Sequence, residues 1–319
     1  MHKLEIIWAD GKSRSFEGCR TVVALGTFDG VHVAHKSLLD SAINLRDKID
    51  AEYVGAWCFS QSPASILKGE LIRSLTTIDE KVRIMNEYGL DFVAVGDFKD
   101  FRNMSAEDFV DTILLDRLGC VGAVCGFNHR FGHRGLGDSS LLKIKLGENR
   151  VVTVNEIKMF DETISSTAIR NKIISGDIEK ANAMLGRRFS LESIVVQGKK
   201  LGREMQFPTA NQYFSEGMII PKHGIYATVC TLADGKRYIG VSNVGTRPTI
   251  SDDKDSHIAN CETHICDFTG DLYGQMLKIE FCAYLREEKR FSSIDELTSA
   301  IENDKNTAIK LFNSKGIEL

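Results

Sequence analysis

The chain has 319 residues, of which 43% are hydrophobic and 26% charged, and its formal net charge is −4. This length exceeds the usual size of one domain, so we expect two domains, each with its own core. General nucleic-acid binders carry a basic excess that this chain lacks, so a small-molecule substrate fits the charge better.

The sequence contains no apolar run of the roughly 18 residues that a membrane-spanning helix needs. Its start, Met1–Glu5, lacks the charged-then-apolar layout of a secretion signal. We therefore expect a cytoplasmic protein with no membrane or nucleic-acid partner. The eight cysteines form no CxxC pair and no zinc-type spacing, so we expect them to be reduced structural thiols.

From Thr21 onward, short β-rich apolar runs alternate with segments of helical spacing. The expected strands are Thr21–Leu25, Tyr53–Phe59, Phe92–Val95 and Val121–Cys125. Two of the intervening helices open with capping-box signals, at Thr77–Glu80 and at Ser105–Asp108. Because parallel strands need crossover connections, the alternation predicts an α/β domain with a parallel sheet and helices on both faces. Ligands of such sheets bind at the carboxyl ends of the strands.

After Gly186 the pattern becomes that of an antiparallel, barrel-like β domain. The expected strands are Ser193–Val196, Ile225–Leu232, Arg237–Ser242, Glu262–Phe268 and Met276–Tyr284, with a hairpin signal at Asp234-Gly235. A terminal helix over Ile294–Ile301 follows two serines that can cap it. We expect the two domains to occupy residues 1–186 and 187–319.

The first expected strand leads into Gly26-Thr27-Phe28-Asp29-Gly30-Val31-His32-Val33-Ala34-His35 and then into a helical pattern. Glycines allow a tight turn, and the N-terminus of a helix offers unpaired amides to an anion. His32 and His35 are three residues apart, so both can face one spot. The segment favours a phosphate site, and the alternative is a glycine-rich turn with incidental surface histidines.

A second segment, Ile164-Ser165-Ser166-Thr167-Ala168-Ile169-Arg170, places hydroxyls at the start of a helix and an arginine one turn later. Amides, hydroxyls and a guanidinium together suit a polyphosphate. The alternative is an N-cap followed by a solvated arginine.

A third segment is the glycine-bearing loop that runs from Gly198 through Gly202 to Phe207-Pro208-Thr209-Ala210-Asn211. Its glycines permit backbone approach to phosphates. Thr209 and Asn211 are two residues apart, so on an extended chain both can offer oxygens to one Mg²⁺ ion. The alternative is an ordinary polar loop.

The pair GTFDGVHxxH and ISSTxIR resembles the bacterial bifunctional riboflavin kinase and FAD synthetase family. In that family the N-terminal domain is a Rossmann-like nucleotidyltransferase of the HxGH type. The third segment is similar to the PTAN signature of riboflavin kinases. Further members of the signature follow in order, at Asn243–Thr249, Glu262–Ile265, Gly270–Gly274 and Leu285-Arg286. The resemblance covers nearly the whole chain.

The resemblance implies that the N-terminal domain transfers an adenylyl group from ATP to FMN, with magnesium present and pyrophosphate released. It implies catalytic roles for His32, His35 and Arg170. The implied ATP-binding residues are Gly26, Thr27, Phe28, Gly30, Ser165, Ser166 and Thr167. The implied flavin-binding residues are Phe59, Pro63, Asn128, Arg130, Phe131 and Asp138.

The resemblance implies that the C-terminal domain phosphorylates riboflavin to FMN with ATP. Glu262 is then the general base, and Thr209 and Asn211 hold Mg²⁺ as well as ATP. Gly198 and Gly202 are implied in ATP binding, and Arg286 in flavin binding. We expect the partners to be riboflavin, FMN and ATP, and the protein to be a monomer or weak homo-oligomer.

Three positions depart from the family pattern. Ala34 replaces the glycine between the histidines, Gln206 replaces the glycine before Phe-Pro-Thr, and Ser62 stands before Pro63 where the family more often has histidine. Two alternatives therefore stay open. One is a nucleotidyltransferase acting on another phosphorylated substrate, and the other is a flavin-binding protein with lost or weakened catalysis.

Overall fold

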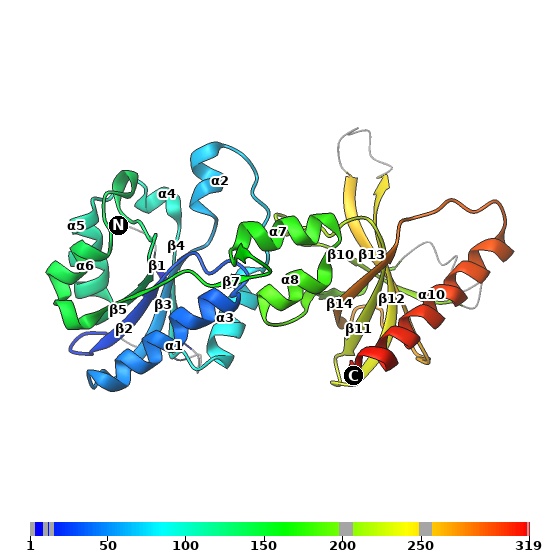
Figure 1. The fold of residues 1–319 in the computed structure, drawn as a ribbon, viewed down its shortest axis with the longest axis horizontal. Helices are drawn as coiled ribbons and strands as arrows, with labels where there is room; N and C mark the ends of the chain where they lie inside the picture. The colour runs from blue at the N-terminus through cyan, green and yellow to red at the C-terminus, as the bar shows by residue number, and fades with distance from the viewer. Residues whose placement is uncertain (1–3, 9–11, 13–15, 198–206, 249–256, 318) are drawn as a thin grey trace. The chain divides into compact units, whose positions relative to one another are not determined.

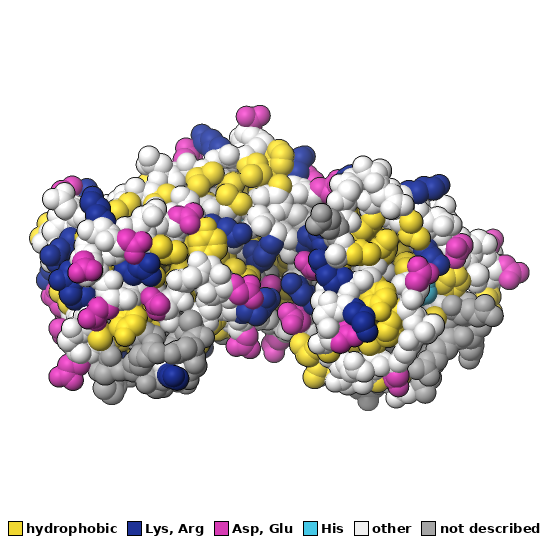
Figure 2. Space-filling model, turned by 90° about the horizontal axis from the view of Figure 1, so that it is seen from below, with side chains coloured by type: hydrophobic (Ala, Val, Ile, Leu, Met, Phe, Trp, Pro, Cys, Tyr) yellow, Lys and Arg dark blue, Asp and Glu magenta, His cyan; other side chains and the backbone are white. Residues whose placement is uncertain are grey.

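The computed structural model describes residues 4–8, 12, 16–197, 207–248, 257–317 and 319. The chain divides into two compact units, residues 1–168 and 169–319 (Figure 1). Among the described residues, no helix is both long enough and apolar enough to cross a membrane. On the face seen in Figure 2, lysine and arginine side chains are interspersed with aspartate and glutamate, without a continuous basic stripe.

The first unit is built on a sheet with the strand order β1-β4-β3-β2-β5-β6. The strands are β1 (Leu4–Trp8), β2 (Thr21–Leu25), β3 (Tyr53–Phe59), β4 (Phe92–Gly96), β5 (Cys120–Gly126) and β6 (Val151–Val154). Strands β2 to β6 are parallel, which confirms the α/β prediction. Strand β1 was not predicted, and it pairs antiparallel to β4 at the edge of the sheet.

Helices cover both faces of this sheet (Figure 1). The helical elements of this unit are α1 (Val33–Lys48), α2 (Pro63–Lys68), α3 (Ile78–Glu87), α4 (Phe98–Phe101), α5 (Ala106–Asp108), the π-helical η1 (Phe109–Arg117), the short η2 (His133–Gly135), α6 (Ser139–Leu146) and the short η3 (Glu148–Arg150). The predicted caps are confirmed, because Thr77 Oγ1 accepts from Glu80 N and Ser105 Oγ accepts from Asp108 N. A two-residue hairpin, β7 (Lys158–Met159) and β8 (Glu162–Thr163), follows.

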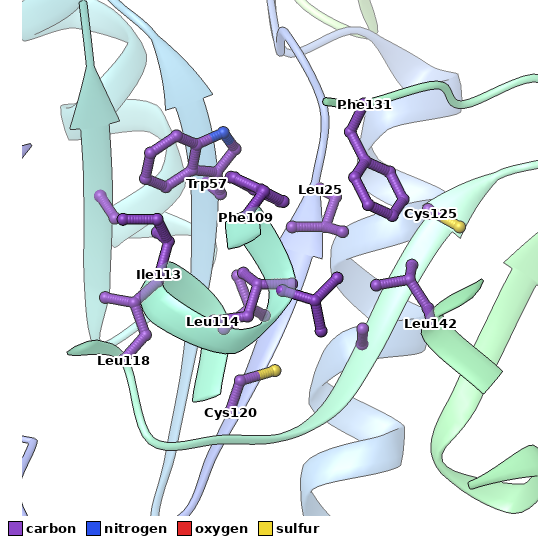
Figure 3. Packing of buried hydrophobic residues seen from close by; sticks show 14 of the residues in the cluster. Leu25, Trp57, Phe109, Ile113, Leu114, Leu118, Cys120, Cys125, Phe131 and Leu142 are labelled. Carbon is purple, nitrogen blue, oxygen red and sulfur yellow. The ribbon is translucent and has the colours of Figure 1, made fainter. Parts of the chain in front are cut away.

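The alternation of side chains along the strands produces two hydrophobic cores, one on each side of the sheet. On β2, Val22 and Ala24 face the core that α1 and α3 cover. Val23 and Leu25 face the opposite core, which Figure 3 shows with Trp57, Phe109 and Phe131. All eight cysteines are free thiols, as predicted, and seven of them are buried. Burial raises the pKa of Cys120 to about 12, so this thiol stays protonated.

The strand order reverses between β2 and β5, since the chain moves outward from β2 through β3 to β4 on one side and through β5 to β6 on the other. Such a reversal leaves a crevice at the carboxyl ends of the two central strands. The segment that starts at Gly26 follows β2, and the segment after Gly126 follows β5. Two of the motifs in the sequence therefore border this crevice.

The second unit is an antiparallel sheet with the strand order β10-β13-β12-β11-β14-β9. Its strands are β9 (Phe189–Ile194), β10 (Thr209–Tyr213), β11 (Gly224–Leu232), β12 (Arg237–Pro248), β13 (His257–Ile265) and β14 (Met276–Arg286). Its helices are α7 (Ser166–Ser175), which begins in the first unit, α8 (Ile178–Leu185) and α10 (Ile294–Lys315). The predicted hairpin is confirmed, since Gly235 has φ 84° and Asp234 accepts from Lys236 N.

Some boundaries in this unit differ from the prediction. Strand β9 begins before Ser193, and α10 extends far beyond Ile301. Strand β10 lies in a segment that was expected to be a loop. Its pairing with β13 explains the difference, because a polar sequence forms a strand when a neighbour supplies the ladder.

Gln212 helps to close the curved sheet between its two edge strands. The side chain is fully buried, and its Nε2 donates to Ser193 O on β9 at 2.8 Å and to Leu277 O on β14 at 2.7 Å. One isolated bridge, between Val196 and Asn211, joins the same edges. The side-chain amide therefore supplies hydrogen bonds where the backbone ladder between β10 and β9 is sparse.

Replacing Gln212 with leucine is expected to destabilise the second unit by about 2–4 kcal/mol, because a buried carbonyl and a half-buried carbonyl lose their donor. Chemical denaturation, followed by a signal from the second unit, measures the change in its free energy of unfolding. Gln275→Leu is the matched control, since Gln275 is exposed and its amide donates to one carbonyl, that of Asp271. Equal stability of the two variants would show that Gln212 does not close the sheet.

Candidate active sites

The loop after β2 has a backbone that few residues adopt easily. Phe28 has φ 49° and Val31 has φ 39°, and both side chains are completely buried. Left-handed backbone is unusual for bulky residues, especially β-branched ones, and costs about 1–3 kcal/mol per residue. Gly30, with φ 83°, adopts the same region without this cost. The loop therefore needs support from the residues around it.

One neighbouring segment, residues 75–81, supplies that support. Its hydrogen bonds run from Leu75 N to Asp29 Oδ1 (2.8 Å), from Gly30 N to Thr76 Oγ1 (3.3 Å) and from Lys81 Nζ to Thr27 O (3.0 Å). Lys81 is only 5% exposed, so its ammonium group is held inside the protein beneath the loop. A buried lysine is rare, and the burial of this one does not follow from its place in the first turn of a predicted helix.

His32 and His35 meet at the N-terminus of α1. His32 is the N-cap, and its Nδ1 accepts a hydrogen bond from His35 N at 3.3 Å. The rings stack with centroids 3.6 Å apart. Because Nδ1 of His32 is an acceptor, the neutral ring carries its proton on Nε2 and can donate from there. Ala34 lies in the helix between them, where alanine causes no backbone strain.

The second motif begins beside the same loop. Ser166 Oγ donates to Asp29 O at 2.9 Å, which joins segments 137 positions apart in the sequence. Ser165 Oγ accepts from Ala168 N, so it caps α7, and Thr167 is exposed. Arg170 follows one turn later in the same helix, beyond the division between the two units.

A cavity of about 690 Å³ opens at the carboxyl ends of the strands in the first unit. Its volume lies in the range of small-molecule sites. Of the residues predicted from the sequence, it is lined by Gly26, Thr27, Phe59, Pro63, Arg130 and Phe131. Further aromatic and apolar walls come from Trp57, Phe98, Phe101, Met104 and Phe109. The cavity thus offers flat apolar surfaces beside the loop that carries the histidines.

Two predicted flavin residues, Asn128 and Asp138, are not among the residues that line this cavity. Asp138 caps α6 by accepting from Ser140 N, and it pairs with Arg130 at 2.9 Å. The hydrogen bond from the Ser140 backbone is the largest of several interactions that lower the pKa of Asp138.

His129, which the sequence reasoning missed, does line the cavity. Burial lowers the pKa of His129 to about 4, so the ring is neutral at pH 7. Its ring packs against Phe131, with centroids 6.0 Å apart. Its position between Asn128 and Arg130, two residues implied in flavin binding, could have indicated that His129 lies at this site.

In the second unit, the register of three strands forms a polar row. Asn211 on β10 and Asn243 on β12 both pair with Glu262 on β13, so all three side chains lie on one face of the sheet. Asn260 Nδ2 donates to Glu262 Oε1 at 3.0 Å, which fixes the carboxylate. The predicted base therefore lies between two side-chain amides, of which the sequence reasoning selected only Asn211.

A second cavity, of about 350 Å³, lies at the start of β10. Thr209 lines it together with Val195, Thr263, Phe268 and the segment Gly270–Tyr273. His264 pairs with Thr209 across the ladder and packs against Phe207, which indicates a structural neighbour. The predicted ATP residues Gly198 and Gly202, and the departure at Gln206, lie outside the described residues.

Arg286 forms a bidentate ion pair with Asp304 and lines neither of the two cavities. Its Nε and Nη2 donate to the two carboxylate oxygens of Asp304 at 2.8 and 2.6 Å. Asp304 is 4% exposed and lies on α10, so the pair fastens this helix to the end of β14.

The two parts of the chain match different family models, and full-length relatives contain both parts. Residues 16–168 match the FAD synthetase family model, and residues 185–312 match the riboflavin kinase model. The bifunctional riboflavin kinase/FMN adenylyltransferase of Bacillus subtilis (strain 168) is 32% identical over 93% of this chain and 94% of that protein. The enzyme of the same name from Escherichia coli (strain K12) is 33% identical over 93% of both chains.

A solved structure from Streptococcus pneumoniae, titled a macrolide-efflux protein, has the same fold. Its TM-score is 0.83 at 25% identity, and the match covers 94% of this chain and 96% of that chain. The two family models, the order of the motifs and the full-length relatives all agree. The chain therefore belongs to the family of bifunctional riboflavin kinase/FMN adenylyltransferases.

Proposed function

We propose that the two reactions of this bifunctional enzyme use the two sites described above, with the residue roles that follow. FMN adenylylation occurs at the loop and cavity of the first unit, and riboflavin phosphorylation occurs at the polar row of the second unit. The observation that carries this proposal is that each unit has its own cavity next to its own motif. We place the functional boundary at residues 186 and 187, close to residue 185, where the riboflavin kinase match begins.

In the first unit, the FMN phosphate attacks the α-phosphorus of ATP, and the bond to the departing pyrophosphate breaks. This reaction needs alignment and charge stabilisation more than covalent help. Nε2 of His32, the ring of His35 and the amides of α1 donate to phosphate oxygens, while Arg170 holds the pyrophosphate. The ATP site is shaped by Gly26, Thr27, Phe28, Gly30, Ser165, Ser166 and Thr167.

The apolar cavity receives the flavin ring between Phe59, Pro63 and Phe131, with Arg130 at its edge. Asn128 and Asp138 support the loop that carries Arg130.

Replacing His35 with alanine is expected to lower kcat/KM for FMN adenylylation about a hundredfold, because one donor to the developing charge is lost. Separation of FAD from FMN after reaction with ATP measures this directly. Riboflavin phosphorylation by the same variant serves as the internal control and is expected to stay within about twofold. An adenylylation rate near that of the parent enzyme would remove His35 from the site.

Lys81→Met is expected to lower adenylylation more than tenfold, since the strained loop loses the donor to Thr27 O. Lys48→Met, at an exposed position in the last turn of α1, is the matched control. The two variants are compared by FAD formation and by thermal unfolding of the first unit. Normal FAD formation by Lys81→Met would mean that the loop keeps its shape without the buried ammonium.

In the second unit, the ribityl 5′-hydroxyl of riboflavin attacks the γ-phosphorus of ATP and ADP leaves. Glu262 accepts the hydroxyl proton, as a carboxylate can when the alcohol becomes acidic in the transition state. The cavity lined by Thr209 and Gly270–Tyr273 receives the nucleotide, and Gly198 and Gly202 contribute to ATP binding. Arg286 acts on the flavin site through its hold on α10.

Thr209 and Asn211 are suitable ligands for Mg²⁺. They offer hydroxyl and amide oxygens on the same face of β10, beside the carboxylate of Glu262. Mg²⁺ prefers such hard oxygens and usually keeps waters and substrate phosphates as its other ligands. Within the described part of the chain, no group of three or more His, Cys, Asp or Glu side chains is arranged to hold a metal alone. When bound, the ion supplies charge compensation for the phosphates of ATP.

Glu262→Gln is expected to reduce riboflavin phosphorylation by about 10² to 10⁴, because the amide cannot accept the proton. Its adenylylation of supplied FMN is expected to equal that of the parent enzyme. Chromatography of the flavins formed from riboflavin and from FMN measures both activities. Loss of both in a folded variant would contradict separate sites.

We place the enzyme in the cytoplasm as a monomer or weak homo-oligomer, acting on riboflavin, FMN and ATP with Mg²⁺. The kinase unit disfavours a nucleotidyltransferase for another phosphorylated substrate, which would not need a riboflavin-phosphorylating partner. Retention of His32, His35, Thr209, Asn211 and Glu262 disfavours a binder without catalysis.

A further inference from the structure

Asn243 occupies the end of the polar row opposite Asn211. Both residues pair with Glu262, from the two strands that flank β13. Neighbouring strands lie about 4.8 Å apart, so Asn243 is one strand spacing from the base, on the side away from Thr209 and the nucleotide cavity. The row therefore has one end on β10, near the proposed nucleotide cavity, and the other end on β12, away from it.

The side-chain oxygen of Asn243 needs a hydrogen-bond donor. Its Oδ1 is buried and has no hydrogen-bond partner among the described residues. A buried acceptor without a donor costs about 1–3 kcal/mol, so such atoms in native proteins call for an explanation. The unsatisfied oxygen lies next to the proposed catalytic base, where a substrate must approach.

The neighbours of Asn243 on the same face do not supply this donor. Ile225, its partner across the ladder on β11, is apolar and belongs to the core beneath α10. Gly245, two residues along β12, has no side chain, and the space above it is occupied by Glu288, whose Oε1 would lie 2.8 Å from an added Cβ. A carboxylate accepts hydrogen bonds and cannot satisfy another acceptor.

We propose that Asn243 Oδ1 accepts a hydrogen bond from a ribityl hydroxyl of riboflavin other than the one that is phosphorylated. This inference rests on the proposed role of Glu262. The ribityl chain carries hydroxyls on adjoining carbons, so a chain whose terminal hydroxyl reaches Glu262 can present another to the next strand. The phosphoryl group then arrives from the β10 side and the alcohol from the β12 side, as in-line transfer requires.

The assignment makes Asn243 a determinant of substrate orientation and specificity. A site that hydrogen-bonds a substrate hydroxyl discriminates against analogues that lack it. Asn243 therefore selects a polyol chain, whereas the flat ring of the flavin contributes apolar contact elsewhere. Its loss should weaken use of riboflavin without changing how the enzyme handles ATP or Mg²⁺.

The test uses the full-length enzyme, the variant Asn243→Ala and riboflavin analogues in which the 2′-, 3′- or 4′-hydroxyl is replaced by hydrogen. We expect kcat/KM for riboflavin to fall about tenfold in the variant, mainly through KM. We expect one analogue to be a poor substrate for the parent enzyme yet to suffer no further loss with Asn243→Ala. The KM for ATP and the Mg²⁺ half-saturation should not change.

Chemical denaturation of the second unit reports whether the same variants fold, and Lys236→Ala, in the exposed turn before β12, is the matched control. Asn243→Ser keeps a small polar residue in the strand and provides a second variant with the same expected pattern if alanine disrupts the sheet. An equal loss with all three analogues, a changed Mg²⁺ requirement, or an unchanged kcat/KM would each overturn the proposal.

Glu262→Gln, measured in parallel, separates this inference from the site assignment itself. If Glu262→Gln phosphorylates riboflavin normally, the site assignment fails and the role of Asn243 fails with it. If Glu262→Gln is inactive while Asn243→Ala behaves as the parent enzyme does, only the role of Asn243 is overturned.

Discussion

The left-handed backbone at Phe28 and Val31 is the constraint on which the first unit depends. It turns the chain from β2 directly into α1, so that His32, the N-cap, and His35 stand at the helix N-terminus close after the carboxyl end of β2. The strain is offset by complete burial of the two side chains and by the hydrogen bonds from residues 75–81. The hydrogen bond from Ser166 then attaches the start of α7 to the same loop. The phosphate site that we propose for this unit therefore rests on backbone geometry more than on individual charged side chains.

In the second unit, the strand register determines which side chains share a face with Glu262. A slip of one residue would move Glu262 to the opposite face of the sheet, away from Asn211 and Asn243. The interior holds the register through a run of hydroxyl contacts, from Thr228 to Ser242 and from Ser242 to Thr263. Gln212 and the ion pair of Arg286 with Asp304 fix the edges and the covering helix. The face that carries Glu262 is thus positioned by polar groups elsewhere in the sheet and on α10.

The sequence predicted features that are local and missed those that depend on distant partners. The caps at Thr77 and Ser105 were predicted because N-capping is decided within four residues. Strands β1 and β10 were missed because their pairing partners, β4 and β13, lie far along the chain. The burial of Lys81 and the pairing of Arg286 with Asp304 were also missed, since neither follows from spacing. The family resemblance supplied the residue roles, whereas periodicity supplied the two fold classes.

We propose two triphosphate sites in one polypeptide, one that exposes the α-phosphorus of ATP and one that exposes the γ-phosphorus. Isothermal titration of the full-length enzyme with a non-hydrolysable ATP analogue and Mg²⁺ counts these sites. We expect two molecules of the analogue to be bound per chain at saturation. A stoichiometry of one per chain, on material that makes both FMN and FAD, would contradict it.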